Sequence, residues 1–448
     1  MITLPHPLES AALSRPDHLA LEWGEERLSY AGLRDRVAGV AAGLARQGCR
    51  PGQRVALVGP PSLDWCVAMH AVGWLGAVAV PLSEGPELSS LVERAQVDLV
   101  LTAKAWPTPE LPPLPERGWP LEEVRFALAT SGTTGEPRIV DLTTSQILLS
   151  SYASAIRLGL STSDCTLCCL PLHHVGGLSV LLRALFAGTS VVLAPFEAAQ
   201  VAGHLDSGRI TGVSLVPSML ASVLDARPEE SFPQALRFLL VGGGPTPDSL
   251  RERCQRLALP VALTWGFTEA ASQVATCFPG ELDKAEGCGT PLPFARVEEE
   301  KGRLQVFGPL VGDVPWLSGD VGRVDEKGRV WVEGRVDDMI LSGGEMVDPQ
   351  EIEAVLTSHP GISEAAVIAR VDGKWGERPV AFLVATDGTP PSEDELKSWC
   401  RTQLMGFKVP DAWHWCENLP RTDLGKLSRA ALRKIESQLG QPVDKLLR

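Results

Sequence analysis

The fold prediction rests on Ala129-Thr130-Ser131-Gly132-Thr133-Thr134-Gly135-Glu136-Pro137-Arg138, in which small and hydroxyl-bearing residues surround two glycines. It follows an apolar alternation at Val124, Phe126 and Leu128, which predicts a buried strand that ends in a loop. Glycines let the backbone approach a ligand closely, and successive amides with four hydroxyls form a concavity that binds anions. Arg138 adds a guanidinium group suited to phosphate oxygens. The stretch therefore predicts a loop that binds the phosphate tail of a nucleotide.

The spacing of this loop differs from that of a Walker A loop, because no Lys-Ser or Lys-Thr pair follows Gly135. Taken alone, the stretch is also compatible with a Ser/Thr/Gly surface turn. Motifs further along the chain favour the nucleotide site over this alternative.

Length and composition limit the classes of protein. The 448 residues suffice for two or more domains, and 44% hydrophobic with 21% charged residues is typical of a globular protein. A formal charge of −14 disfavours nucleic acid or an anionic membrane as partner. The longest apolar runs, residues 66–82 and 178–193, are interrupted by His70 and Arg183, so we expect no membrane span. Ten cysteines without the spacing of a secreted scaffold, and a start without a signal-peptide pattern, predict a cytoplasmic location and reduced thiols.

Strand-like and helix-like segments alternate along the first part of the chain. Strands are expected at residues 54–58, 77–81, 97–101, 165–170, 191–194, 212–216, 238–241 and 261–263, and a helical run is expected after each of the last five. Two earlier helices are expected, one after Ser29, whose side chain can cap it, and one at 63–75. This alternation predicts βαβ units and a parallel sheet. Six prolines in residues 105–120 predict a linker. Residues 304–307 and 330–332 resemble antiparallel strands, with 325–328 as their hairpin turn.

The pattern changes after Arg335. Short strands at residues 365–369, 380–384 and 412–416 alternate with polar helices at 349–358, 393–404 and 428–438. This predicts a small α+β domain of about a hundred residues.

A cluster of histidines and cysteines follows the strand at 165–170. An imidazole such as that of His174 can steer a reacting carboxylate by hydrogen bonding, although a structural histidine is the plainer interpretation. Cys165, Cys168, Cys169, His173 and His174 also suggest a metal site. Neighbouring residues of a strand point to opposite faces, which disfavours that alternative.

Two further strands end in residues that suit a nucleotide. Gly242-Gly243-Gly244 lets a flat ring lie against bare backbone, or else forms a tight connection to a helix. Thr264-Trp265-Gly266-Phe267-Thr268-Glu269 offers an aromatic ring and a carboxylate suited to Mg²⁺, although a Thr-Glu pair also starts helices.

Six segments, in this order, resemble the motifs of the adenylate-forming ligases, the superfamily of acyl-CoA synthetases, luciferases and peptide-synthetase adenylation domains. The first loop is similar to T-S-G-T-T-G-K-P-K-G, from which Glu136, Arg138 and Ile139 depart. The other five are P-L-[FH]-H-x-x-G at 171–177, Y-G-x-T-E at 265–269 with Trp265 for Tyr, W-x-[ST]-G-D at 316–320, G-R-x-D-D-x-I-x-x-x-G-E at 334–345 and L-P-R-T-x-x-G-K-[IL]-x-R at 419–429.

The resemblance implies a role for each matching residue. Nucleotide binding is implied for Thr130, Ser131, Gly132, Thr133, Thr134, Gly135 and Arg138 (phosphates), Gly242, Gly243, Gly244, Trp265 and Gly266 (adenine), and Asp320 and Arg335 (ribose). Catalytic roles are implied for Lys426, His174, Thr268 and Glu269, of which His174 also lines the acyl pocket and Glu269 holds Mg²⁺. Asp337 would be the hinge, and Ser342, Gly343 and Gly344 a loop used with coenzyme A. For Lys426 the chemistry agrees, because an ammonium can bridge a carboxylate and an α-phosphate.

The implied fold is α/β, with a large N-terminal domain (residues 1–336) of βαβ sheets and helices plus a small β-barrel-like part, and a small mobile α+β C-terminal domain (337–448). The implied activity is ATP-dependent ligation of a carboxylic acid to coenzyme A, with Mg²⁺, through an acyl adenylate. The expected partners are therefore small molecules; a homodimer is left open.

The acid is indicated by residues 170–180, 242–245 and 268–276, which resemble the o-succinylbenzoate–CoA ligases of menaquinone synthesis. Ser272 and Gln273 would then lie beside the aromatic acid. Benzoate-type and fatty acyl ligases share much of this pattern and stay open as alternatives. Glu136 and Ile139 raise a different alternative, a non-catalytic adenylate-binding protein, against which the retained motif residues argue.

Overall fold

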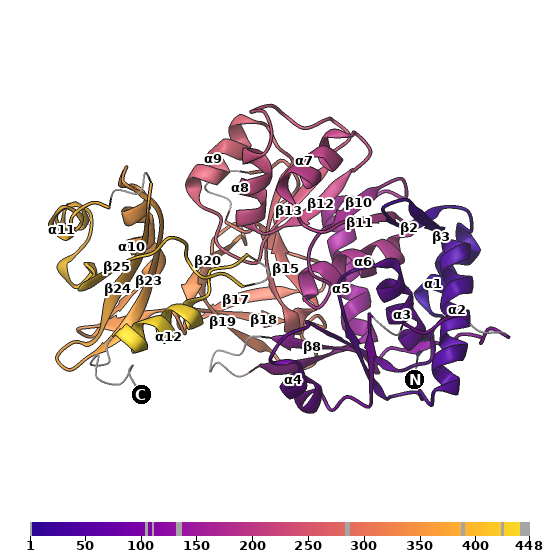
Figure 1. The fold of residues 1–448 in the computed structure, drawn as a ribbon. Coiled ribbons are helices and arrows are strands. Elements are labelled where there is room, and N and C mark those ends of the chain that lie inside the picture. The colour runs from indigo at the N-terminus through magenta and orange to yellow at the C-terminus, as the bar shows by residue number, and fades with distance from the viewer. Residues whose placement is uncertain are drawn as a thin grey trace. The chain divides into compact units, whose positions relative to one another are not determined.

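The computed structural model describes residues 2–103, 106–109, 112–130, 137–282, 287–386, 390–422 and 425–439. The chain divides into two compact units (Figure 1). The first unit comprises Met1–Glu298, Gln305–Leu317 and Val324–Trp331, and the second comprises Glu299–Leu304, Ser318–Arg323 and Val332–Arg448. Most of the expected phosphate loop, Ser131 to Gly135 with Glu136, lies outside the described residues.

A five-stranded sheet with the order β6-β4-β5-β8-β9 carries that loop. Its strands are β4 (Arg54–Val58), β5 (Val78–Leu82), β6 (Leu99–Thr102), β8 (Val124–Thr130) and β9 (Arg138–Thr143). The expected parallel pairing of the first three is confirmed. Strand β9 was not predicted; it pairs antiparallel to β8, with Thr130 opposite Arg138. The expected phosphate loop therefore connects two antiparallel strands.

A nine-stranded sheet with the order β16-β15-β14-β13-β12-β10-β11-β2-β3 forms the larger part of the first unit. Its strands are β2 (Leu19–Trp23), β3 (Glu26–Ser29), β10 (Cys165–Cys168), β11 (Ser190–Leu193), β12 (Gly212–Leu215), β13 (Phe238–Val241), β14 (Val261–Phe267), β15 (Ser272–Thr276) and β16 (Thr290–Pro291). Six strands that are adjacent in the sheet, β14, β13, β12, β10, β11 and β2, are parallel, as expected from the βαβ pattern. The associated helices are α5 (Thr144–Leu158), α6 (Val175–Ala187), α7 (Ala198–Asp206), α8 (Pro217–Asp225) and α9 (Asp248–Arg256), the last three beside β12 and β13 in Figure 1.

The helical run expected after residues 261–263 is wrong. Strand β14 continues to Phe267, a single 3-10 turn η1 (Thr268–Ala270) follows, and β15 returns antiparallel. Gly266 permits this return, because a Cβ atom there would lie 1.9 Å from the carbonyl oxygen of Ser272. The close approach of two strands thus overrides the helical character of the Thr-Glu-Ala-Ala sequence.

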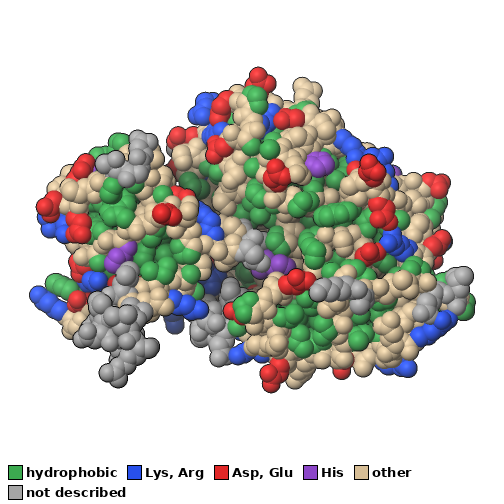
Figure 2. Space-filling view, viewed as in Figure 1, with side chains coloured by type: hydrophobic (Ala, Val, Ile, Leu, Met, Phe, Trp, Pro, Cys, Tyr) green, Lys and Arg blue, Asp and Glu red, His purple; other side chains and the backbone are tan. Residues whose placement is uncertain are grey.

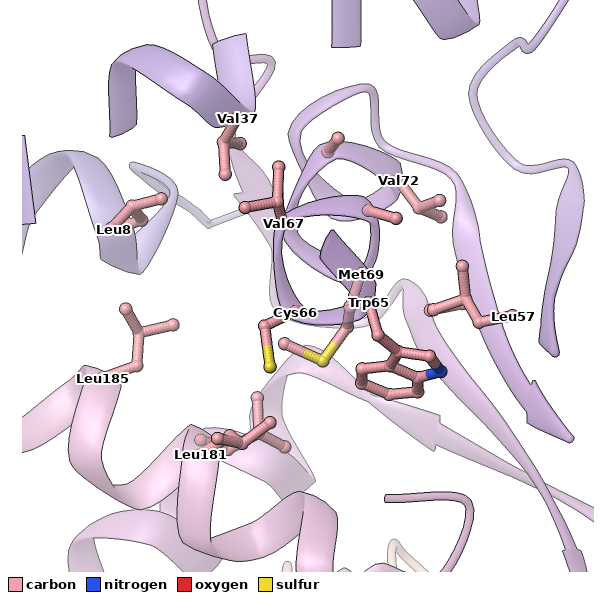
Figure 3. Close-up of a cluster of buried hydrophobic side chains, with 14 of the residues drawn as sticks. Leu8, Val37, Leu57, Trp65, Cys66, Val67, Met69, Val72, Leu181 and Leu185 are labelled. Carbon is pink, nitrogen blue, oxygen red and sulfur yellow. The ribbon is translucent and has the colours of Figure 1, made fainter. Parts of the chain in front are cut away.

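Three helices near the N-terminus pack into one apolar core. They are α1 (Pro7–Ser14), α2 (Tyr30–Arg46), which Ser29 caps as predicted, and α3 (Leu63–Trp74). All residues of α3 except Asp64 are buried, as expected of a helix that is apolar on every side. In Figure 3, Cys66 and Met69 point toward Leu181 of α6, and Val67 points toward Val37 of α2.

A four-stranded sheet contains β17 (Arg296–Glu300), β18 (Arg303–Phe307), β19 (Trp316–Val324) and β20 (Val330–Arg335), in that order. The turn at 325–328 joins β19 to β20. The expectation that this turn connects the strand at 304–307, which is part of β18, to the strand at 330–332 is therefore wrong. Within the described residues this sheet is open, and no closed barrel forms.

The second unit contains a five-stranded sheet with the order β22-β21-β24-β23, to which β25 adds beside β24. Its strands are β21 (Ile340–Ser342), β22 (Glu345–Val347), β23 (Ile362–Asp372), β24 (Gly376–Ala385) and β25 (Ala412–Trp415), and its helices are α10 (Pro349–Thr357), α11 (Glu393–Arg401) and α12 (Arg429–Leu439). The three expected strands and three expected helices are confirmed; the β21–β22 hairpin was not predicted.

The visible face carries charges of both signs. Acidic and basic side chains are interspersed there among uncharged and hydrophobic ones (Figure 2). Among the described helices, none combines the length and the apolar character that crossing a bilayer requires. All ten cysteines are free thiols.

Two buried histidines lie together beneath the N-terminus. The expected linker at 105–120 ends in the short strand β7 (Trp119–Pro120), which pairs with β1 (Thr3–Leu4) and brings Trp119 to 4.8 Å from His6, measured between ring centroids. The ring of His70 lies 6.0 Å from that of His6. Burial lowers the pKa of His70 to about 4. The pKa of His6 is also lowered, mainly by burial and further by the charges of His70 and Arg125.

Acid is therefore expected to destabilise the first unit. Both histidines are neutral when folded and take up protons near pH 6.5 when unfolded, so stability is complete above pH 6.5 and declines as the pH falls toward about 4. For His70 alone the loss approaches about 3 kcal/mol. Denaturant unfolding at pH 7 and pH 4.5 measures this loss of unfolding free energy. The substitution His70→Asn should weaken the dependence of stability on pH.

The matched control for this prediction is His204→Asn, which changes a partly exposed histidine of α7. It should leave the pH dependence as in the unmodified protein. If His70→Asn also keeps the full dependence, the buried pair is not its cause.

Candidate functional site

Several candidate residues lie at one edge of the nine-stranded sheet. Strands β10, β13 and β14 run parallel, so their carboxyl ends point the same way. His174 follows the first, the Gly242–Gly244 turn follows the second, and Thr268 with Glu269 ends the third. Ligands of open α/β sheets bind at this edge.

The glycine turn and the end of β14 are in contact. A Cβ atom on Gly242 would lie 2.5 Å from Cγ2 of Thr264, and Gly243 has a φ of +83°, so both positions favour glycine. Trp265 is 7% exposed, and its ring lies edge-on to Phe267 at 5.6 Å between centroids. Trp265 is therefore a packed side chain as well as the predicted adenine neighbour.

The turn that carries Thr268 and Glu269 is held against strand β9. Gln146, in the first turn of α5, donates from Nε2 to the carbonyl oxygens of Glu269 and Leu310, both at 3.2 Å. A capping box with Thr143 fixes Gln146 in turn. The turn therefore packs beside β9 and the start of α5, the two segments that follow the expected phosphate loop in the chain.

The donor set around Glu269 suits Mg²⁺ rather than a metal held by protein alone. Its carboxylate is partly exposed, and within the described ranges no three His, Cys, Asp or Glu side chains gather in a way that could hold a metal. Mg²⁺ commonly takes one or two carboxylates and completes its shell with phosphate and water oxygens. The single carboxylate therefore fits an ion that arrives with a nucleotide.

A small polar cavity lies between α5, α6 and β15. It measures about 10 Å³ and is lined by Ser150, Ser151, Ser154, Ser179, Arg183, Ser272 and Gln273. Ser272 donates to Ser179 at 3.2 Å, and Gln273 accepts from Ser154. Ser272 and Gln273, the two residues expected beside the acid, therefore both line this cavity.

Arg183 is the charged residue among the cavity residues that sequence reasoning missed. Its side chain is 2% exposed and donates from Nη1 to Ser154 at 3.1 Å, whereas Nη2 has no hydrogen-bond partner. Burial lowers its pKa to about 10, so it stays charged at neutral pH. No acidic side chain of the described residues pairs with it. A buried cation without a counter-ion is costly unless a ligand supplies one.

His174 occupies the N-cap position of α6 without a capping hydrogen bond from its side chain, and it does not line the cavity. The same helix carries Ser179 and Arg183 further along. Nearby, Cys165, Cys168 and Cys169 are buried, and burial raises the pKa of Cys168 to about 12. Metals require thiolates, so the structure gives the alternative Cys/His metal site no support.

Asp320, Arg335 and Asp337 form a group of their own in the second unit. Arg335 donates from Nη1 to Asp320 at 3.2 Å, and its Nη2 lies 3.7 Å from Asp337. Gly319 leaves room for this guanidinium, because a Cβ atom there would lie 2.6 Å from Nη2 of Arg335 and the arginine side chain would have to shift. The buried Asp320 carboxylate is thus held in place by the guanidinium predicted to share its ligand.

Lys426 lies in a tight turn before α12. The amide of Thr422 donates to the carbonyl of Lys426 at 2.7 Å, and the amide of Gly425 donates to Thr422 at 2.8 Å. Gly425 has a φ of +73°, which suits glycine. The turn fixes the backbone from which the lysine extends.

Comparison with known families matches both units. The model of the AMP-binding enzyme family covers residues 8–120 and 103–314, and that of the AMP-binding enzyme C-terminal domain covers 351–426. The chain belongs to the AMP-binding enzyme family. This AMP-binding enzyme is 34% identical to the 2-succinylbenzoate–CoA ligase of Bacillus cereus over 98% of its own length and 100% of that protein. It is also 34% identical to the enzyme of that name from Bacillus cytotoxicus, over 97% and 99%.

Solved structures give the same relationship. The o-succinylbenzoate CoA synthetase of Bacillus subtilis bound to the acyl-adenylate intermediate shares 29% identity and a TM-score of 0.85 with this AMP-binding enzyme, covering 97% of this chain and 99% of that one. Its complex with ATP and a magnesium ion gives a TM-score of 0.88 at 29% identity, covering 96% and 100%. The α/β fold expected from the sequence is confirmed.

Proposed function

We propose that this chain is an ATP-dependent acid–CoA ligase that converts o-succinylbenzoate to its CoA thioester, a step in menaquinone synthesis. The observation that carries the proposal is the similarity to 2-succinylbenzoate–CoA ligases over practically the whole of both chains. The buried guanidinium of Arg183 supports the choice of acid, because o-succinylbenzoate has a second carboxylate that is not activated.

The first half-reaction forms an acyl adenylate. The substrate carboxylate attacks the α-phosphorus of ATP, and the bond to the β-phosphate breaks as pyrophosphate leaves. Thr268 and Arg138 bind phosphate oxygens, with the loop from Thr130 to Gly135, while Lys426 bridges the carboxylate and the α-phosphate. Catalysis is alignment and charge stabilisation. Glu269 would hold Mg²⁺, which neutralises phosphate charge when bound.

The second half-reaction transfers the acyl group. The sulfur of coenzyme A attacks the acyl carbonyl, its proton passes to solvent, and AMP leaves with the electron pair of the broken bond. We assign residues 1–336 to the nucleotide and acid domain and 337–448 to a lid that turns about Asp337 between the steps. Asp320 and Arg335 then hold the ribose, and Ser342, Gly343 and Gly344 approach the adenylate.

The acid lies beside Ser272 and Gln273, with its second carboxylate facing Arg183. The cavity there has room for about one water molecule, so a carboxylate enters only when the lining side chains rotate. The five serines of the lining and Arg183 offer hydroxyl and guanidinium donors once these side chains have rotated. His174 contacts the reacting carboxylate at the N-terminus of the same helix.

The compartment and the oligomeric state belong to the proposal as well. A cytoplasmic location agrees with ten free thiols and with substrates that are cytoplasmic metabolites. A homodimer is the oligomer to test, by sedimentation of the purified chain.

Pyrophosphate exchange into ATP tests whether the chain is an enzyme at all. Glu136 in the phosphate loop favours the rival view, a protein that binds adenylate without reacting it. Exchange that depends on added o-succinylbenzoate supports the ligase. Absence of exchange with every aromatic and fatty acid, in a folded protein that binds ATP, supports the rival.

A further inference from the structure

A tight hairpin carries the loop assigned to the second half-reaction. Ser342 and Glu345 are paired across β21 and β22, with only Gly343 and Gly344 between them. Both glycines have positive φ, +65° and +89°, as the mirror-image turns of two-residue hairpins require. The turn therefore has a defined shape of its own.

Strand β24 fastens this hairpin from one side. The amide of Gly343 donates to the carbonyl of Trp375 at 2.8 Å, Ser342 pairs with Gly376, and the amide of Leu341 donates to Glu377 at 2.8 Å. The next residue of the strand is Arg378. Trp375 and the first residues of β24 thus contact the hairpin one after another.

Arg378 uses all of its donors. Its Nε and Nη2 each donate to Asp411 at 2.8 Å, and Nη2 also donates to the carbonyl of Val409 at 3.1 Å. Its Nη1 donates to Oγ of Ser342 at 2.9 Å and to the carbonyl of Phe407 at 2.6 Å. These five bonds account for the five N–H groups of a guanidinium.

The hydrogen-bond network of Arg378 includes the side chain of Ser342 in the hairpin. Oγ of Ser342 donates to the carbonyl of Phe407 at 3.2 Å, so Ser342, Arg378 and Phe407 form a triangle of hydrogen bonds. Ser342 is fully buried and Arg378 is 8% exposed, which shields these bonds from water. A lysine has three donors on one nitrogen and cannot reproduce this fork.

We propose that Arg378 is a positioning residue for thioester formation: it ties Ser342 to Phe407 and Asp411 and so holds the Ser342–Glu345 turn in its working shape. The inference rests on the proposed function of that turn. Preorganisation of the turn means that less conformational freedom is lost when the acyl adenylate meets coenzyme A. The adenylation step does not use the turn and is independent of Arg378.

The test separates the two half-reactions in Arg378→Met. Pyrophosphate exchange should match the unmodified enzyme, while thioester formation from supplied acyl adenylate should fall about 10- to 100-fold. Hydrogen exchange of residues 340–347 should become faster. Arg378→Lys should recover part of the rate, because one nitrogen can still reach Ser342 or Asp411.

Arg370→Met is the matched control. Arg370 faces Arg378 across the β23–β24 pair but lies near Glu436 instead of the hairpin. Its loss should leave both half-reactions and the exchange of residues 340–347 unchanged. Equal loss of both steps in Arg378→Met, or an unchanged thioester step, overturns the inference. If the unmodified chain itself forms no adenylate, the proposed function fails instead.

Discussion

Replacing Lys426 with alanine is expected to lower adenylate formation about 10²- to 10³-fold and to spare thioester formation from supplied acyl adenylate. The ammonium stabilises charge that moves from the attacking carboxylate to the leaving pyrophosphate, and no pyrophosphate leaves in the second step. The turn around Lys426 is set by hydrogen bonds of Thr422 and Gly425, so the fold should survive the change. Pyrophosphate exchange measures the first step, and CoA thioester release measures the second.

Lys434→Ala provides the control for this prediction. Lys434 is an exposed lysine of α12 in the same unit, and its loss should leave both steps unchanged. A Lys426→Ala enzyme that loses both steps equally would contradict the assigned role. So would one that still forms adenylate at the normal rate.

Replacing Arg183 with methionine is expected to lower kcat/KM for o-succinylbenzoate about 10²- to 10³-fold, with the KM for ATP unchanged. The reason is the loss of a buried, charge-assisted contact to the second carboxylate, which is worth about 2–5 kcal/mol in comparable cases. Removing an unpaired buried cation should not lower the free energy of unfolding, so the defect should be confined to the acid. Steady-state kinetics with varied acid measures it.

The comparison of acids makes this prediction specific. Activity toward aromatic acids with a single carboxylate should change little in Arg183→Met, and Arg183→Lys should recover part of the kcat/KM for o-succinylbenzoate. Arg125→Met, which removes a buried arginine of β8 away from the cavity, serves as control. If Arg183→Met lowers kcat/KM equally for acids with one and with two carboxylates, Arg183 does not bind the second carboxylate.

Local signals predicted the regular elements of this chain well. Strands β4 and β13 have the bounds expected from their apolar runs, and Ser29 caps α2 as its hydroxyl and position indicate. Strand β15 was missed because it exists only where Gly266 lets two strands approach; its own residues favour a helix. The apolar and polar residues of 268–276 do not express this backbone contact, so their pattern alone did not predict the strand.

Some residues of the candidate site could likewise be selected from the sequence, and others only from the structure. Motif spacing was enough to select Glu269, Asp320 and Lys426, because each lies in a distinctive short sequence. Arg183 was noticed only as an interruption of an apolar run. Its importance comes from the packing of α5, α6 and β15 around it, which neither periodicity nor a motif expresses. A charged residue within an otherwise apolar helix is the signal that could have found it.

Mass spectrometry of the products formed with ATP, Mg²⁺, coenzyme A and a panel of carboxylic acids shows which reaction the chain catalyses. We expect AMP and the CoA thioester of o-succinylbenzoate, formed in preference to thioesters of benzoate-type and fatty acids. A folded protein that yields neither thioester nor acyl adenylate from any acid of the panel would contradict it.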